Sequence, residues 1–306
     1  MILKLIKATT AATAAAWSAI WTFPSILLSA FIIAWAAEAA GFNAMTIADS
    51  VAYPYESDST YPYTDDGGRE FLDGKEIIEA FILATALCAA TTTLKFNMFV
   101  LKLPIRPPAL VAKQAGSLAA LFDNRLGLGV GTSPWPEDYE LMDVPFARRG
   151  KRMDECIEIV KGLTTGEYFE FHGEFYDIPK TKMTPAPTKP VPILIGGHAD
   201  VALRRAARND GWMHGGGDLG DPEALDRFIN RLKQLREEEG RTGPFEIHAM
   251  SLDAYKPDGI KRLEDRGVTD IMVGFRIPYI VGPDTEPLEN KIRAIEKYGE
   301  KVIAKL

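Results

Sequence analysis

Apolar and polar positions follow two alternating periods along most of the chain. Short apolar runs of strand length recur, and each is followed by a longer segment with apolar residues three and four positions apart, the spacing of one helix face. This pattern predicts eight strands, at residues 2–7, 44–48, 94–101, 125–131, 193–195, 210–213, 245–252 and 270–275. It predicts the helices that follow them at residues 25–40, 75–90, 108–121, 146–165, 201–208, 222–239, 257–266 and 288–305.

The regular alternation of strand and helix indicates the fold class. Eight strand–helix units in 306 residues predict an α/β fold, a closed (β/α)8 TIM barrel in a single domain over residues 1–306. An open doubly wound sheet is the alternative, but the units do not group into two halves. Two polar segments, 53–74 and 166–190, are predicted insertions after strands 2 and 4. In the second insertion, the alternation about His172-Gly173 predicts a hairpin with a two-residue turn.

The strand predicted at 125–131 is rich in glycine. Its apolar residues alternate with glycines, and the strand ends in Gly131, followed by Thr132 and Ser133. Glycine inside a strand usually marks a close approach by a ligand or another backbone, and α/β proteins bind ligands at the carboxyl ends of strands. The spacing also suggests a dinucleotide-binding fingerprint, but that motif needs a helix directly after the third glycine, and Pro134 disfavours one. A glycine-rich core strand without a ligand is the plainer alternative.

Composition narrows the classes of function. The net charge of −7 at pH 7 argues against nucleic-acid binding, which needs a basic face. Cys88 and Cys156 lie in apolar helical patterns, so we interpret both as reduced core thiols of a cytoplasmic protein. The four histidines are scattered and lack carboxylates at metal-ligand spacing, so we expect no metal site. They are His172, His198, His214 and His248.

The first forty residues are unusually apolar. Residues 8–37 carry no charge and resemble a signal peptide or a membrane span. Pro24 splits the run, and its second half continues directly into the predicted helix and strand, so we expect no membrane attachment. A helix that is apolar on several sides favours a subunit contact, and we expect a homodimer.

The predicted carboxyl ends of the strands carry glycines, hydroxyls and amides but few ionisable groups. That composition suits a cofactor that performs the chemistry itself. Gly196-Gly197 before a helix is the candidate phosphate site, because free backbone N–H groups and the helix dipole favour an anion there. His198 either donates to that phosphate or caps the helix. Asp49 is either a site carboxylate or an acceptor for backbone N–H groups in the turn after its strand.

Several runs of sequence together resemble one known family. They are residues 40–42 with 46–49, 103–114, 125–135, 149–155, 172–176 and 192–198. These runs resemble the bacterial-luciferase-like flavin superfamily, specifically its actinobacterial branch of oxidoreductases that use coenzyme F420, a deazaflavin. The resemblance implies that the cofactor ring lies across the strand ends, backed by a non-prolyl cis peptide within residues 96–98. The cofactor-binding residues that it implies are Asn97, Met98, Gly131, Thr132 and Ser133 near the ring, and Gly196, Gly197 and His198 at the phosphate.

One departure from the family affects the chemistry. Many relatives have a histidine after the aspartate of the second strand, where this chain has Asp49-Ser50. A serine hydroxyl relays a proton but does not hold one near neutral pH as imidazole does. The catalytic candidates are therefore Asp49, Ser50 and His198. We expect hydride transfer between F420 and a small organic substrate. An FMN-dependent luciferase-like monooxygenase is the alternative, and a non-catalytic cofactor-binding or membrane-associated protein is a third hypothesis.

Overall fold

The computed structural model describes residues 25–306, apart from 65, 217, 220, 222 and 276–278. The strand predicted at residues 2–7 lies outside the described residues. Among the helices that are described, none combines the length and the apolar character needed to cross a membrane.

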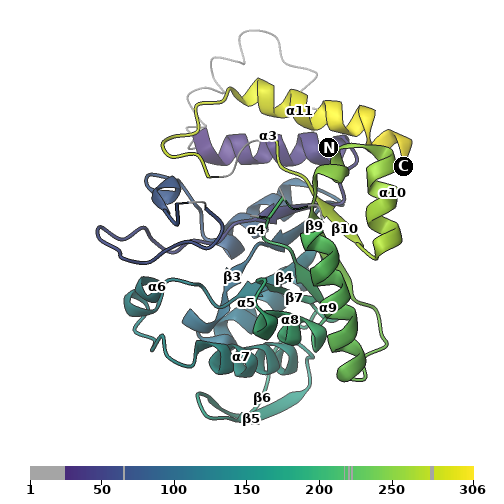
Figure 1. The fold of residues 1–306 in the computed structure, drawn as a ribbon. Helices are drawn as coiled ribbons and strands as arrows, with labels where there is room; N and C mark the ends of the chain where they lie inside the picture. The colour runs from purple at the N-terminus through teal and green to yellow at the C-terminus, as the bar shows by residue number, and fades with distance from the viewer. Residues whose placement is uncertain (1–24, 65, 217, 220, 222, 276–278) are drawn as a thin grey trace.

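Parallel strands form one curled sheet with the order β1-β2-β4-β7-β8-β9-β10, and the short β3 pairs with β4 (Figure 1). The order along the sheet follows the order along the chain, as repeated strand–helix units require. The strands of this sheet are β1 (Ala44–Ile47), β2 (Lys95–Met98), β3 (Leu101–Lys102), β4 (Leu126–Gly131), β7 (Ile193–Gly196), β8 (Gly211–Met213), β9 (Glu246–Met250) and β10 (Asp270–Met272).

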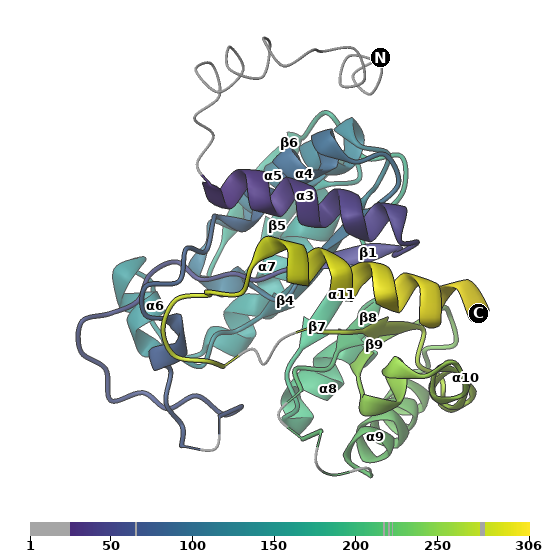
Figure 2. The ribbon, with the colours of Figure 1, turned by 90° about the horizontal axis from the view of Figure 1, so that it is seen from above.

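Helices cover the outer face of this sheet, and α3 and α11 lie side by side across one end of it (Figure 2). The helices are α3 (Ser25–Ala39), α4 (Ala80–Ala90), α5 (Pro108–Leu121), α6 (Pro136–Leu141), α7 (Arg149–Leu163), α8 (Asp200–Ala207), α9 (Ala224–Glu238), α10 (Pro257–Arg266) and α11 (Leu288–Lys301). Four short 3-10 helices complete the described part: η1 (Glu70–Leu72), η2 (Leu103–Ile105), η3 (Leu252–Tyr255) and η4 (Ile303–Lys305). The predicted elements from the helix at 25–40 onward are thus confirmed, with shifted ends.

The two faces of the sheet carry different residues, because successive side chains of a strand point to opposite faces. The apolar residues of β4 and β7, such as Leu128 and Ile195, join the main hydrophobic core with the helices. On the opposite face, the register places Gly129 beside Leu194 and Leu194 beside Gly211. The glycines on that face make room for neighbouring side chains, Gly129 for Met213 and Gly211 for Leu194.

The described part of the sheet is a curled half-barrel rather than a closed barrel. In the strand order, β1 and β10 are the two ends, and no pairing joins them in the described chain. A cavity of about 700 Å³ lies along both of these edges, and residues of α3 and α11 also line it.

Two details of the sequence prediction are wrong. The antiparallel hairpin of β5 (Tyr168–His172) and β6 (Asp177–Lys182) pairs His172 with Asp177, so its loop has four residues and His172-Gly173 is not a two-residue turn. The reason is Glu155 on α7, whose carboxylate accepts from the loop N–H groups of residues 174–176. In addition, the strand predicted at 94–101 is interrupted between β2 and β3, and the interruption bears on the candidate site.

Candidate active site at the carboxyl ends of the strands

Asp49, which follows β1, is held in a two-point ion pair with Arg106. Arg106 donates from Nη2 to Oδ1 at 2.7 Å and from Nη1 to Oδ2 at 2.9 Å, and the backbone N–H of Lys102 also donates to Oδ2. The Asp49 side chain is 1% exposed. Its carboxylate therefore ties the end of β1 to the segment after β3. Ser50, the next residue, is half-buried.

Val100 lies over the ends of β4 and β7. A β-carbon on Gly131 would come within 2.7 Å of Val100 Cγ2, and a β-carbon on Gly196 within 2.8 Å of Val100 Cγ1. The two glycines thus make room for Val100, whose side chain lies against the ends of both β4 and β7. A non-prolyl cis peptide joins Phe99 to Val100, just after the stretch 96–98 in which the family resemblance places it.

The residues after β4 are bound to one another. Ser133 has a φ of 53° and donates from its hydroxyl to Asp138 at 2.6 Å. Asp138 also pairs with Lys102 at 2.7 Å, and the backbone carbonyl of Thr132 accepts from Tyr139. The short helix α6 was not predicted from the sequence. It begins at Pro136, and proline is favoured at the first helical position. A dinucleotide fingerprint would need the helix to begin directly after Gly131, so α6 begins four residues too late for one.

Two buried cations lie over the ring of Trp135. The Lys102 ammonium is 4.6 Å and the Arg69 guanidinium 4.9 Å from its ring centroids. Among the described residues, Nε and Nη2 of Arg69 and Nε1 of Trp135 are buried donors without a hydrogen bond. Arg69 does lie 3.3 Å from Glu137, so its charge is balanced although these donors are not satisfied.

The first insertion folds over this region through an aromatic cluster. Tyr61 is its centre, with ring centroids of Tyr63, Phe71, Trp135 and Tyr279 at 5.3–5.6 Å. Burial, with nearby phenols, raises the pKa of Tyr61 far above its ordinary value, so the hydroxyl stays protonated. The cluster places an apolar cover above the ends of β4 and β7.

Gly197 and His198 connect β7 to α8. Gly197 has a φ of +114°, a conformation that side chains other than hydrogen rarely adopt. The first turn of α8 has no side-chain cap, because its N-cap is the exposed Ala199. Nε2 of His198 accepts a hydrogen bond from the backbone N–H of Gly215 at 3.1 Å, so the proton of the neutral ring is on Nδ1. Burial, followed by the neighbouring His214, lowers the pKa of His198 to about 4.

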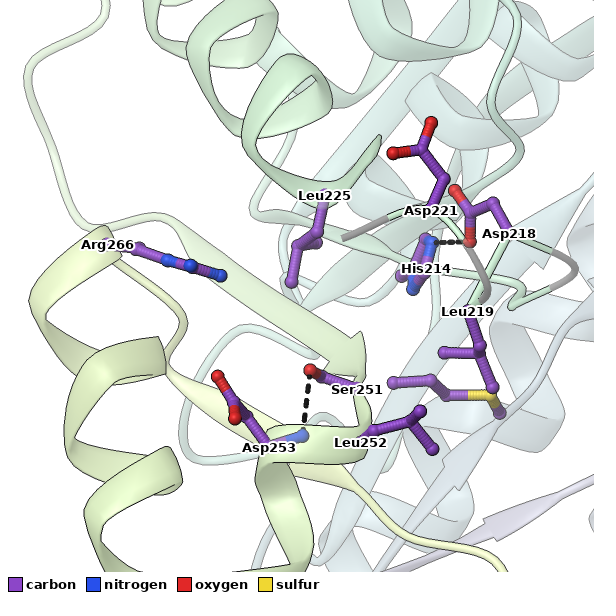
Figure 3. Close-up of a pocket in the computed structure, with 10 residues that line it drawn as sticks. His214, Asp218, Leu219, Asp221, Leu225, Ser251, Leu252, Asp253 and Arg266 are labelled. Atoms are coloured by element: carbon purple, nitrogen blue, oxygen red, sulfur yellow. Dashed lines mark hydrogen bonds and ion pairs between the residues drawn. The ribbon is translucent and has the colours of Figure 1, made fainter. Parts of the chain in front are cut away.

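Two of the four histidines that are scattered along the sequence lie together in the structure. The rings of His198 and His214 stack with centroids 4.8 Å apart and planes at 17°. Nε2 of His214 lies 2.8 Å from Oδ1 of Asp218 (Figure 3), and one ligand atom from each of these three residues lies within 4.8 Å of the others. His198 and His214 are sixteen positions apart, so only the pairing of β7 with β8 could bring them together.

The remaining two candidates, Asn97 and Met98, are buried in β2. Asn97 points toward Gly127 and lines the cavity between β1 and β10. Met98 is fully buried in the hydrophobic core. Met98 is the last residue of β2, two residues before Val100.

Residues 30–302 match the family described as luciferase-like monooxygenase. The chain belongs to the luciferase-like monooxygenase family. It is 74% identical over 274 residues to the uncharacterized protein Rv0940c of Mycobacterium tuberculosis (strain ATCC 25618 / H37Rv), covering 90% of this chain and 94% of that protein.

Two solved structures show the luciferase-like fold of this chain. The monooxygenase RslO1 from Streptomyces bottropensis superposes with a TM-score of 0.69 at 15% identity, covering 91% of this chain and 93% of the other. The coenzyme F420 dependent tetrahydromethanopterin reductase from Methanopyrus kandleri superposes with a TM-score of 0.67 at 15% identity, covering 91% and 95%.

Sequence reasoning missed several residues of this luciferase-like site. Val100 carried no signal, because its neighbours on β4 and β7 are distant in sequence. Arg69 and Tyr63 lie in an insertion that is rich in turn residues and has no hydrophobic periodicity. The sequence therefore did not predict which way their side chains point. Asp218 is four residues after His214, a spacing that is common to many surface loops.

Proposed function

We propose that this luciferase-like protein is an oxidoreductase that transfers hydride between coenzyme F420 and a small organic substrate. The observation that carries the proposal is that the polar side chains at the strand ends are bound to one another, Asp49 to Arg106 and Ser133 to Asp138. Side chains held in this way are poor nucleophiles and bases, so a bound redox cofactor suits the site better than direct attack by a side chain. The similar fold of an F420-dependent reductase supports this choice of cofactor.

The residues present fit a flat ring at the ends of β4 and β7. When bound, the deazaflavin supplies or accepts the hydride. In our proposal, the methyl groups of Val100 form the apolar surface behind the ring, because they occupy the room above Gly131 and Gly196. Thr132, half-buried at the end of β4, is the polar residue beside it. The cluster around Tyr61 excludes water from above.

The residues between β7 and α8 fit a phosphate. The backbone turns at Gly197 and presents the uncapped first turn of α8 behind Ala199. Unpaired N–H groups and the positive end of the helix dipole favour an anion at such a position. Valine at Gly197 would test this site poorly, because the φ of +114° strains any side chain there and the fold would change together with the binding.

Ala199 offers a cleaner test of the phosphate site. We expect Ala199→Asp to raise the melting temperature, because aspartate caps the helix, and to weaken F420 binding at least about tenfold, because its charge repels the phosphate. Ala199→Ser is the matched control, since it caps the helix without a charge and should keep most of the affinity. Equal affinity of the aspartate variant and the unaltered protein would contradict a phosphate at α8.

Proton handling falls to His198 in this proposal, with Ser50 as a relay. Both oxygens of Asp49 accept from Arg106, so this carboxylate is the least available of the three catalytic candidates. His198 is neutral near pH 7 and carries its proton on Nδ1, the atom not bound to Gly215. It can therefore donate a hydrogen bond to a substrate oxygen. The buried donors of Arg69 and Trp135, which make no hydrogen bond among the described residues, suit the same kind of acceptor, a carbonyl group.

An FMN-dependent monooxygenase is the second candidate, and the likeness to RslO1 favours it. Fluorescence titration of the full chain with F420 and with FMN separates the two. Our proposal expects micromolar or tighter F420 binding and weaker binding of FMN. Tight binding of FMN alone would favour the monooxygenase over the F420-dependent oxidoreductase. Binding of neither cofactor would overturn both candidate functions.

A further inference from the structure

Three buried polar atoms meet at the carboxyl end of β8 without satisfying one another. They are Nε2 of His214 and the two carboxylate oxygens of Asp218. Like Nδ1 of His214, none of them has a hydrogen bond within the described part of the chain. The His214 side chain is 2% exposed. Because more than about nine tenths of buried polar groups in proteins have a partner, such a group of atoms indicates a ligand.

The two side chains are close enough to share one ion. Nε2 of His214 is 2.8 Å from Oδ1 of Asp218 in an ion-pair contact, and neither atom has another partner among the described residues. Two ligands of one ion have this relationship, since each directs a lone pair at the ion instead of at its neighbour. With metal–nitrogen and metal–oxygen bonds of about 2.1 Å at the tetrahedral angle, two ligand atoms are about 3.4 Å apart, so the two side chains would separate by about 0.6 Å on binding an ion.

His198 supplies a third ligand beside this pair. The single lone pair of its Nε2 accepts from the N–H of Gly215, the residue after His214, so His198 has to give up this hydrogen bond to bind an ion. The ligand atoms of His198, His214 and Asp218 lie within 4.8 Å of one another. The rings of the two histidines are nearly parallel, so His198 has to turn its edge toward an ion that His214 and Asp218 already face. We therefore expect His198 to contribute less than the other two.

The space next to the pair suits the remaining ligands. A pocket of about 180 Å³ is lined by His214 and Asp218 on one side and by Ser251 and Leu252 on the other (Figure 3). It is large enough for several water molecules. We propose that His198, His214 and Asp218 bind one divalent transition-metal ion of the Zn²⁺ type, with water from this pocket completing its coordination. Two imidazoles and one carboxylate are the nitrogen and oxygen ligands that such ions prefer.

A second group of similar composition does not have these features. Nε2 of His248 forms a hydrogen bond of 2.7 Å with Glu246 and lies 3.4 Å from Asp270. Lys95 adds a nearby positive charge that helps to lower the pKa of Glu246. The group is thus satisfied by its own members, and it provides an internal control.

The experiment titrates the full chain, first treated with a chelator, with Co²⁺, whose visible absorption reports ligation by nitrogen and oxygen. We expect one equivalent to bind and to be displaced by Zn²⁺. Asp218→Asn and His214→Asn should weaken binding at least about 100-fold and His198→Asn about tenfold, since loss of a ligand costs more than loss of an outer partner. His172→Asn, which alters an exposed His–Asp pair on the hairpin, and His248→Asn should leave the affinity unchanged.

The circular dichroism spectrum and melting temperature of each variant without metal show whether it is folded. The proposal is overturned if the unaltered chain binds no Co²⁺ saturably, if folded Asp218→Asn binds as tightly as the unaltered chain, or if His248→Asn removes the binding. These readouts do not involve F420 or FMN, so they are independent of the proposed redox function.

Discussion

Val100 occupies the space that Gly196 leaves above the end of β7, where a β-carbon would come within 2.8 Å of Val100 Cγ1. We therefore expect Gly196→Ala to destabilise the protein by about 1–3 kcal/mol, as overpacking of a filled site does. Shortening the neighbour in the double variant Gly196→Ala/Val100→Ala should recover part of that loss. Urea unfolding of the two single variants and the double variant measures the coupling.

Strict additivity of these two substitutions would contradict the contact. It would also weaken the proposal that Val100 forms the surface behind the cofactor ring, because that role depends on the position of its methyl groups.

The ion pair between Asp49 and Arg106 is buried, and breaking it should be costly. Asp49→Asn leaves the guanidinium, whose side chain is 12% exposed, without its counter-charge. We expect a loss of about 3–5 kcal/mol in the free energy of unfolding. Asp200→Asn is the control at the surface, because it weakens pairs with Arg204 and Arg231 at an exposed carboxylate and should cost less than about 1 kcal/mol. Similar losses in the two variants would show that the buried pair contributes no more to the free energy of unfolding than the exposed one.

Glu38 gives the fold a specific dependence on pH. Burial alone would raise the pKa of Glu38, but the N–H groups of Thr93, Thr92 and Leu94 outweigh it and lower the pKa to about 2. A carboxyl whose pKa is lowered on folding stabilises the protein above its unfolded pKa of about 4.5, and this contribution is lost as the pH falls toward 2. Glu38→Gln should therefore reduce stability by about 1 kcal/mol at pH 7.

The check is the difference in unfolding free energy between the Glu38→Gln variant and the unaltered protein, measured from pH 7 to pH 2. It should shrink between pH 4.5 and 2. A difference that is constant over this range would mean that the charge of Glu38 has no part in holding the segment before β2.

Trp135 holds the first insertion over the strand ends. Trp135→Ala removes the ring that contacts Tyr61 and lies between Arg69 and Lys102. We expect a loss of about 3–5 kcal/mol in stability and faster proteolytic cleavage within residues 53–74. Tyr55→Ala, at a side chain that is 99% exposed in the same insertion, should leave the cleavage rate unchanged. Equal cleavage in both variants would mean that Trp135 does not anchor the insertion.

The sequence by itself determined the strand–helix order and most element positions, because those depend on local periodicity. The helix Pro108–Leu121 and the strand that ends in Gly131 lie where their patterns place them. It also indicated which strand ends matter, since glycines such as Gly196 and Gly197 are visible without any coordinates.

Only the tertiary structure decided what those positions contact. Pairing between distant strands placed Val100 against Gly131, set His214 beside His198, and bound Asp49 to Arg106. None of these partners is adjacent in sequence, and periodicity reports which face a residue lies on but not what lies opposite it. The curled sheet brings the ends of β2, β4, β7 and β8 to one rim. Candidate residues that are far apart in the sequence therefore lie close together and can form one site.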